Sequence, residues 1–485
     1  MHVFTRAGGP GARRPARVLR RDAHGGPVPL RFAAAPLRWA LAGLLGVACG
    51  AAHAGALLDV YRGALDSDPI YLSTLRQGEA AAEFAEQAKA LRRPSVSLMA
   101  ARAHTQNQVI QSPGQSVYAP GMRSYPGGEY ALSIVQPLVN PVSDATGVQA
   151  VAKSQQIDAE LDSNRQELVW RVAERYLAAA AAHESLGAVQ AELAALQDHL
   201  ERVTIRQRAG LARSTDALES RARLGEARAR AAEVRLRYVD ALEALQEVTG
   251  SPPSRLGLLA VGAPDAAVEA VSTAQALAFD PGAHPLVRAK RHAVAVAEAE
   301  LQRQRGAGSP SVDAMLRIGR ARANGSLYGG LSDIETNELR VTLNLPIYAG
   351  GMIASREREA AKLLDRARED LRGVERSLAR GVETARARIR SAGLRTEAML
   401  TSVRANEEAF RGKQLAYQSG LATNLSVLDA RRELAQAQGE FARAQYDLLL
   451  AMLALRRMTG LLDEQDVRFV DDLLARDVDP DAGRN

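Results

Sequence analysis

The sequence predicts a mainly α-helical protein built from two tandem copies of one plan, with two β-strands in each copy. Residues Gly210–Gly250 and Gly420–Gly460 align without a gap at a spacing of 210 residues, and both begin with Gly-Leu-Ala and end with Thr-Gly. In both segments apolar residues recur in alternating steps of three and four. This 3.5-residue period is typical of helices that pack lengthwise on other helices, so the chain contains a duplicated coiled-coil helix.

The composition allows a large core and does not favour a nucleic-acid-binding protein. The chain has 485 residues, 46% of them hydrophobic, and a formal net charge of +6. Residues 1–54 hold eight arginines against one acid, which leaves 54 basic and 55 acidic residues in the rest. The excess positive charge therefore belongs to the leader and not to a folded basic surface.

Residues 1–54 are typical of a secretory signal peptide. The apolar run Trp39–Ala54 follows the basic leader and ends in Ala52-His53-Ala54, which predicts cleavage after Ala54. An uncleaved anchor is the alternative, and the length of the leader makes a translation start in place of Val28 a further one. Cys49 is the sole cysteine, which excludes a disulfide within the mature chain; its lipidation is the weaker alternative, because Gly46 replaces the usual leucine.

The rest of the chain is divided by glycines and prolines into elements that occur twice. We expect repeat 1 at 55–250, a linker with short helical pieces at 251–283, repeat 2 at 284–460 and a C-terminal tail at 461–485, disordered after Asp477. In repeat 1 the pattern predicts a helix at Leu57–Leu91, strands at Ser95–His104 and Glu129–Leu138, a helix at Asp144–Arg208, and a returning helix capped by Ser214 or Thr215. In repeat 2 it predicts a first helix, strands at Ser311–Arg322 and Glu338–Tyr348, and helices at Met352–Tyr417 and Thr423–Gly460.

The strand at Glu338–Tyr348 alternates most regularly. Leu339, Val341, Leu343, Leu345 and Ile347 share one face, and Glu338, Arg340, Thr342 and Asn344 share the other. A small soluble sheet covered by the helices explains this pattern, and so does a membrane sheet. A membrane sheet has to close on itself, four strands cannot do so, and three chains would supply twelve strands. A cyclic trimer is therefore implied if the strands are transmembrane, with the first set facing lipid and the second set facing the lumen.

Motifs for catalysis are absent from the sequence. It has no phosphate-binding loop, HExxH, CxxC or GxSxG, and its eight histidines are scattered. Carboxylates are abundant but lie on long charged helices, where a solvated face is the simpler explanation. We expect no enzyme activity, no cofactor and no metal site.

Four stretches resemble the TolC family of outer membrane channels, in particular the branch that works in type I secretion. They are the segment that opens at Asp68, Leu343–Gly351, Tyr417–Ala430 and Thr459–Val467. The resemblance implies a homotrimer with a twelve-stranded β-barrel in the outer membrane of a Gram-negative bacterium and a long α-helical tunnel through the periplasm. It implies a periplasmic adaptor and an inner-membrane ABC transporter or other pump as partners. Toxin export, such as that of an adenylate cyclase toxin, and drug efflux both stay open as the cargo.

The resemblance also implies that the periplasmic entrance lies at the helix pair around Tyr417–Asp429. Asp429 matches an aspartate of the family's closing ring, Tyr417 the linking tyrosine, and Thr215-Asp216 its partner pair. Ser426 replaces the second ring aspartate, Ala422 replaces the linking arginine, and Glu219 lies opposite Asp429 at the 210-residue offset. Without the family, Asp429 would be interpreted as a solvated helix residue. A periplasmic coiled-coil scaffold without a pore stays the alternative to an export duct.

Overall fold

The structure is a computed structural model that describes residues 56–110, 121–259, 279–325, 330–474 and 476–478. Residues 54–485 form one compact unit. The predicted signal peptide with Cys49, most of the predicted linker and residues 479–485 lie outside the described residues. The predictions made for them stay predictions.

The described chain repeats one order of elements, as predicted. The first copy has α1 (Ala56–Ser67), α2 (Pro69–Ala90), β1 (Ser95–Val109), β2 (Gly121–Val139), α3 (Pro141–Arg208) and α4 (Ser214–Thr249). The second copy has the 3₁₀ helix η1 (Pro281–Ala283), α6 (Pro285–Gly306), β4 (Ser311–Ala323), β5 (Ser332–Asn344), α7 (Met352–Gln418) and α8 (Asn424–Thr459). Two short strands, β3 (Leu256–Leu258) and β6 (Arg476–Val478), and helix α9 (Glu464–Leu473) complete the chain.

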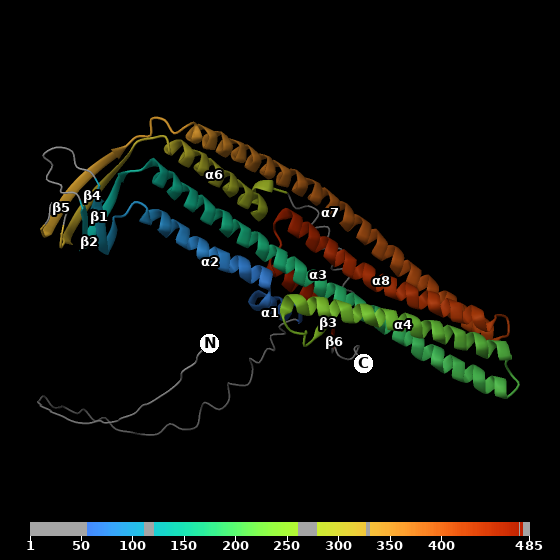
Figure 1. The fold of residues 1–485 in the computed structure, drawn as a ribbon. Helices are drawn as coiled ribbons and strands as arrows, with labels where there is room; N and C mark the ends of the chain where they lie inside the picture. The colour runs from blue at the N-terminus through green and yellow to red at the C-terminus, as the bar shows by residue number, and fades with distance from the viewer. Residues whose placement is uncertain (1–55, 111–120, 260–278, 326–329, 475, 479–485) are drawn as a thin grey trace, which may run out of the picture. The chain divides into compact units, whose positions relative to one another are not determined.

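Two very long helices set the scale of the fold. Helix α3 has 68 residues and α7 has 67, which at about 1.5 Å per residue gives roughly 100 Å each. Helix α4 returns along α3, and α8 returns along α7 (Figure 1). Strands β1, β2, β4 and β5 lie at one end of these helices, and the α3–α4 and α7–α8 turns, called here the tips, lie at the other end (Figure 1).

The four long strands form one antiparallel sheet in the order β1-β2-β4-β5. The hairpins of the two copies are therefore neighbours, joined where β2 pairs with β4. Val312, Ala314 and Leu316 lie opposite Leu343, Val341 and Leu339 in the β4–β5 register. Since side chains opposite each other share a face, the apolar residues of both strands form one continuous surface.

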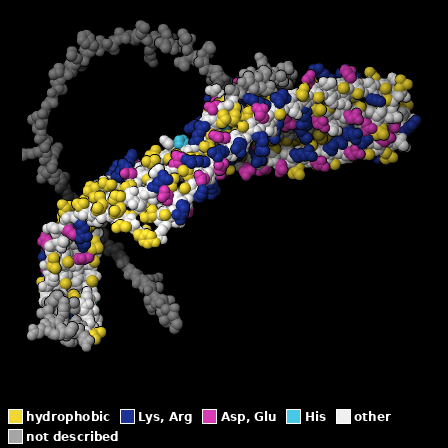
Figure 2. All heavy atoms as spheres, turned by 90° about the horizontal axis from the view of Figure 1, so that it is seen from above, with side chains coloured by type: hydrophobic (Ala, Val, Ile, Leu, Met, Phe, Trp, Pro, Cys, Tyr) yellow, Lys and Arg dark blue, Asp and Glu magenta, His cyan; other side chains and the backbone are white. Residues whose placement is uncertain are grey.

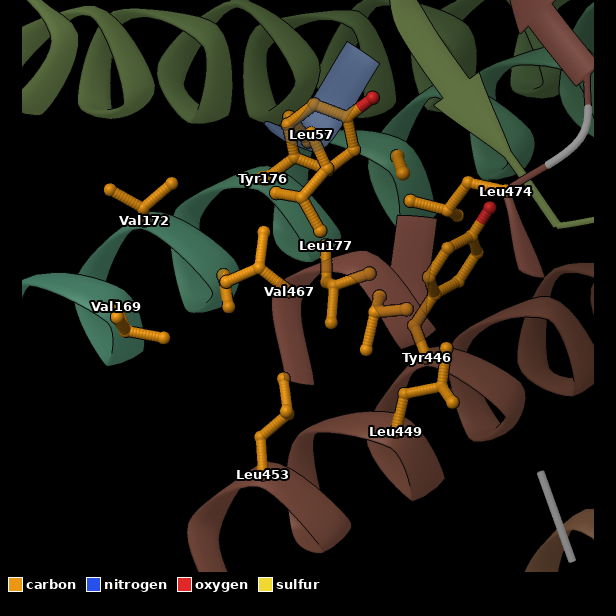
Figure 3. Packing of buried hydrophobic residues seen from close by; sticks show 14 of the residues in the cluster. Leu57, Val169, Val172, Tyr176, Leu177, Tyr446, Leu449, Leu453, Val467 and Leu474 are labelled. Carbon is orange, nitrogen blue, oxygen red and sulfur yellow. The ribbon is translucent and has the colours of Figure 1, made fainter. Parts of the chain in front are cut away.

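The largest buried cluster lies midway along the helices. Side chains of α3 (Val169, Val172, Tyr176, Leu177) point toward those of α8 and α9 (Tyr446, Leu449, Leu453, Val467), with Leu57 beside them (Figure 3). The backbone N–H groups of Gly257 and Leu259 donate to the Tyr176 and Tyr446 hydroxyls at 2.6 and 3.3 Å. The segment around β3 is thus held to both repeats by polar bonds as well as by burial.

The structure corrects several predicted boundaries in the first copy. The helix expected at Leu57–Leu91 is interrupted at Asp68, whose carboxylate accepts from Tyr71 N at 2.7 Å and begins α2, while Pro69 has no N–H to continue α1. Strand β1 continues past its predicted end at His104, and β2 begins before its predicted start at Glu129. In both strands the backbone pairing continues where the side chains become polar.

Two further predictions are wrong. Strand β5 ends at Asn344 and not at Tyr348, so Leu345 follows the strand, where Pro346 lacks a donor for the ladder. The N-cap of α4 is Arg213 and not Ser214 or Thr215. Short strands β3 and β6 pair inside the segments predicted as linker and tail, and that division of the chain stays a prediction.

Candidate functional site

The two tips have the same backbone. Gly210 and Gly420 lie in the left-handed region with φ of 73° and 74°, which favours glycine. Leu211 N donates to Arg206 O and Leu421 N to Ala416 O, each at 2.8 Å. The turn that reverses each helix pair is therefore a retained feature of the duplication.

Asn424 joins the two tips. It is 2% exposed, and its Nδ2 donates to Asp216 O at 3.1 Å and to Ser220 Oγ at 3.3 Å, both on α4. Its Oδ1 lies 2.6 Å from Nε2 of His199 on α3. One buried amide therefore connects α8 with both helices of the first copy.

Asp429 also connects the copies, through an ion pair. Arg223 Nη2 on α4 donates to Asp429 Oδ1 at 2.6 Å, and Arg223 Nη1 donates to Glu226 at 2.8 Å. Arg432 Nη2 lies 3.9 Å from the same Asp429 oxygen. The hydrogen bond to Glu226 and the charge of Asp429 raise the pKa of Arg223. The carboxylate predicted for the ring is thus partly neutralised within its own chain.

The other predicted entrance residues lie around this connection without all touching it. Glu219 Oε2 accepts from Asn424 Nδ2 at 3.4 Å, and Asp216 Oδ2 accepts from Arg213 N at 3.4 Å. Ser426 bonds to Thr423, the N-cap of α8. Thr215 is exposed and Ala422 half-buried. Tyr417 lies under Arg206 of α3, 5.8 Å from ring centroid to guanidinium carbon.

Sequence reasoning missed Arg223 and Asn424. A signal for Arg223 was present, because it lies one helical turn after Glu219, the residue at the 210-residue offset from Asp429. Nothing marked Asn424, since asparagine at a helix start is usually an exposed cap. Its counterpart in the first copy, Ser214, is exposed.

At the other end of the helices the sheet exposes its apolar face. Leu339, Val341 and Leu343 are 77, 64 and 67% exposed. On the opposite face Arg340 pairs with Glu338, and Arg317 Nη2 lies 3.9 Å from Glu129. Among the described residues, neither β1 nor β5 pairs along its outer edge. In the described residues the sheet therefore has one apolar face, one polar face and two unpaired edges.

The surface of the helices differs from that of the sheet region. Figure 2 shows hydrophobic side chains gathered where the strands meet the helices, and intermixed basic and acidic side chains along the rest of the helical part. In the part of the chain that the structure describes, no helix is both long and apolar enough to cross a membrane. Nor do His, Cys, Asp and Glu side chains group there in a way that could hold a metal ion.

Known proteins match this chain over most of its length. The chain matches the family described as outer membrane efflux protein over residues 61–251 and 282–461, that is, once in each copy. It is similar to the outer membrane protein TolC of Vibrio cholerae, with 27% identity over 429 residues, 88% of this chain and 95% of that protein. It is also similar to the alkaline protease secretion protein AprF of Pseudomonas aeruginosa, with 26% identity over 435 residues, 86% of this chain and 87% of that protein.

Solved structures share the fold. The outer membrane protein VceC of Vibrio cholerae has a TM-score of 0.67 and 19% identity, covering 83% of this chain and 96% of that one. The Campylobacter jejuni CmeC outer membrane channel has a TM-score of 0.72 and 13% identity, covering 87% of this chain and 89% of that one.

Proposed function

The chain belongs to the outer membrane efflux protein family, and on that premise we propose that it forms a trimeric export duct for type I protein secretion. Membership confirms the predicted TolC resemblance, the mainly helical two-copy fold and the location in the outer membrane of a Gram-negative bacterium. The family consists of channels and not of enzymes. Trimer closure, cargo and partners are the proposal.

The sheet is the observation that carries the duct. Its two edges are open in the described chain and its apolar face is exposed, which a soluble scaffold would have to cover. Pairing β5 of one chain with β1 of the next would satisfy both edges, and three chains would close twelve strands. Leu339, Val341 and Leu343 would then face lipid, and Glu338, Arg340, Thr342 and Asn344 the lumen.

The partners follow from the other end of the helices. The tips would dock with a periplasmic adaptor and, through it, with an inner-membrane ABC transporter. Type I secretion of a protein is favoured over drug efflux because the relatives include proteins named for alkaline protease secretion and for proteases secretion. Efflux of small molecules is the alternative, since a relative in Brucella suis is named an outer membrane efflux protein.

Fractionation and conductance test the duct together. We expect the mature chain in the outer membrane fraction as a trimer that conducts ions in planar bilayers. Recovery of a soluble periplasmic monomer would contradict the duct and favour a scaffold. For the cargo, the gene is expressed in a strain that lacks its own channel but keeps an adaptor and an ABC transporter for a secreted protease. Restored protease secretion without restored drug resistance supports type I secretion, and the reverse supports efflux.

A further inference from the structure

A cavity of about 240 Å³ lies near the tips, lined by residues of α3, α7 and α8. Four basic side chains line it: His199, Arg202 and Arg206 from α3, and Arg431 from α8. Phe410 and Tyr417 of α7 supply two aromatic walls. No Asp or Glu is among the described residues that line it. The cavity is therefore lined by positive charge and by rings.

The arginines of this cavity differ from those nearby on α4. Arg223 and Arg230 each hold a carboxylate, of Asp429 and Glu192, at 2.6 Å. Within the described residues, Arg202, Arg206 and Arg431 make no ion pair with a carboxylate. Their charge is left available to something other than this chain.

Aromatic rings hold two of these guanidinium groups in place. The Arg431 guanidinium lies 5.2 Å from the Phe410 ring centroid, and that of Arg206 lies 5.8 Å from Tyr417. A ring occupies the face of a guanidinium and leaves the N–H donors at its edge free. These donors match a planar carboxylate, which accepts two parallel bonds from one guanidinium.

Burial is the largest influence on the protonation of Arg431 and His199 in this cavity. Burial lowers the pKa of Arg431 and of His199, and the charge of Arg202 lowers both further. The charges of Glu192 and Asp198 act in the opposite direction on Arg431 but leave its pKa below the usual value. An anion in the cavity would offset the cost of burying these charges, because opposite charge favours the protonated form of each group.

We propose that this cavity is an oxyanion site that receives the carboxylate of an acidic side chain on the periplasmic partner that docks at the tips. The inference rests on the proposed function, which places the partner at this end of the helices. Three observations carry it: three arginines that line one cavity, the rings that orient two of them, and the absence of a carboxylate among the described lining residues. In a trimer the site occurs three times, so that three identical contacts add along one docking face.

A fluorescent reporter tests the site in the full-length trimer. Phe410→Trp places a tryptophan against Arg431, where tryptophan keeps the cation–π contact. The only other tryptophan of the mature chain, Trp170, gives the background in protein with Phe410 intact. N-acetylglutamate α-amide is titrated as the probe, and N-acetylglutamine α-amide is its uncharged match, both at constant ionic strength. Inorganic phosphate is the third arm.

We expect a saturable change in the emission of the introduced tryptophan with the glutamate probe and none with the glutamine probe. Arg202→Gln or Arg431→Gln in the reporter protein should weaken binding by about tenfold or more. Arg202 is exposed, so its replacement leaves the fold intact. Arg208→Gln, which removes one exposed arginine of the same tip outside the cavity, is the matched control and should change nothing.

Three results would overturn the proposal. They are no saturation with the glutamate probe, equal loss in Arg208→Gln, and binding of phosphate without binding of the glutamate probe. In a second measurement, Arg202→Gln should reduce cross-linking of the trimer to its adaptor while single-channel conductance stays unchanged. If the trimer of the unaltered chain does not conduct ions, the proposed duct itself is refuted. Probe binding does not depend on conductance, so the two failures are distinguishable.

Discussion

The two ends of the long helices differ in where their polar groups find partners. At the sheet end, the edges of β1 and β5 are open among the described residues, and Leu339 is 77% exposed. At the tips, Asn424 is 2% exposed and bonded to α3 and α4 of the same chain. An unpaired strand edge and an exposed apolar face need another surface to cover them, whereas an amide with all its hydrogen bonds made does not. The sheet is thus incomplete in one chain, while the tips are joined within it.

The largest effect should come from breaking the sheet end. Leu343→Arg places a charge on the apolar face and should cost about 2–4 kcal/mol near the bilayer midplane. Thr342→Arg, on the polar face of the same strand, should be tolerated. The amount of trimer in the outer membrane fraction measures both. Equal loss of trimer in the two variants would refute the assigned faces and remove the contrast between the ends.

A smaller effect should follow from breaking the joined tips. Asn424→Ala leaves Asp216 O and His199 without their bonds to the amide, which should cost about 1–3 kcal/mol. Faster hydrogen exchange in the first turns of α4 and α8 would report the loss, with the sheet unchanged. Ser214→Ala, the equivalent but exposed position of the first copy, is the control. If both variants exchange alike, Asn424 does not join the copies.

Comparison of the two tips explains what the sequence could predict. The alignment of Gly210 with Gly420 predicted the shared turn, because a left-handed glycine is a local requirement of the chain. Local signals likewise predicted α7 and α8 to within one residue. The contacts that join the copies were not predictable, because Arg223 meets Asp429 across 206 residues of sequence. Nor was the end of β1, where pairing and not side-chain pattern extends the strand.

Lower pH should reduce the local stability of the tips and leave that of the sheet unchanged. Burial lowers the pKa of His199, with Arg202 and Arg431 acting in the same direction and the Asn424 bond and Asp216 opposing. The fold therefore favours the neutral ring, so its contribution is present above the unfolded value of about 6.5 and is lost as pH falls through the lower folded pKa. The protection factors of the tip amides, which correct for the slower intrinsic exchange at low pH, should fall on acidification. His199→Gln, which does not titrate, should remove that dependence, and its persistence would exclude His199 as the cause.

The smallest energetic effect is expected at Arg223 and Asp429, where it decides how the entrance treats ions. The side chains are 22 and 34% exposed, so a double-mutant cycle should give a coupling of only about 0.2–1 kcal/mol.

If three Asp429 carboxylates line the narrowest point, Arg223 offsets much of the negative potential that would attract cations. Single-channel recording with a trivalent cation added from the periplasmic side should therefore show stronger block in Arg223→Gln than in the unaltered trimer. The block should disappear in Asp429→Ala and weaken as salt rises. Arg221→Gln, on the same helix and exposed, is the matched control. Unchanged block in Arg223→Gln would mean that Asp429 does not face the pore, and block that vanishes only when Glu219 is also replaced would mean that both copies form the constriction.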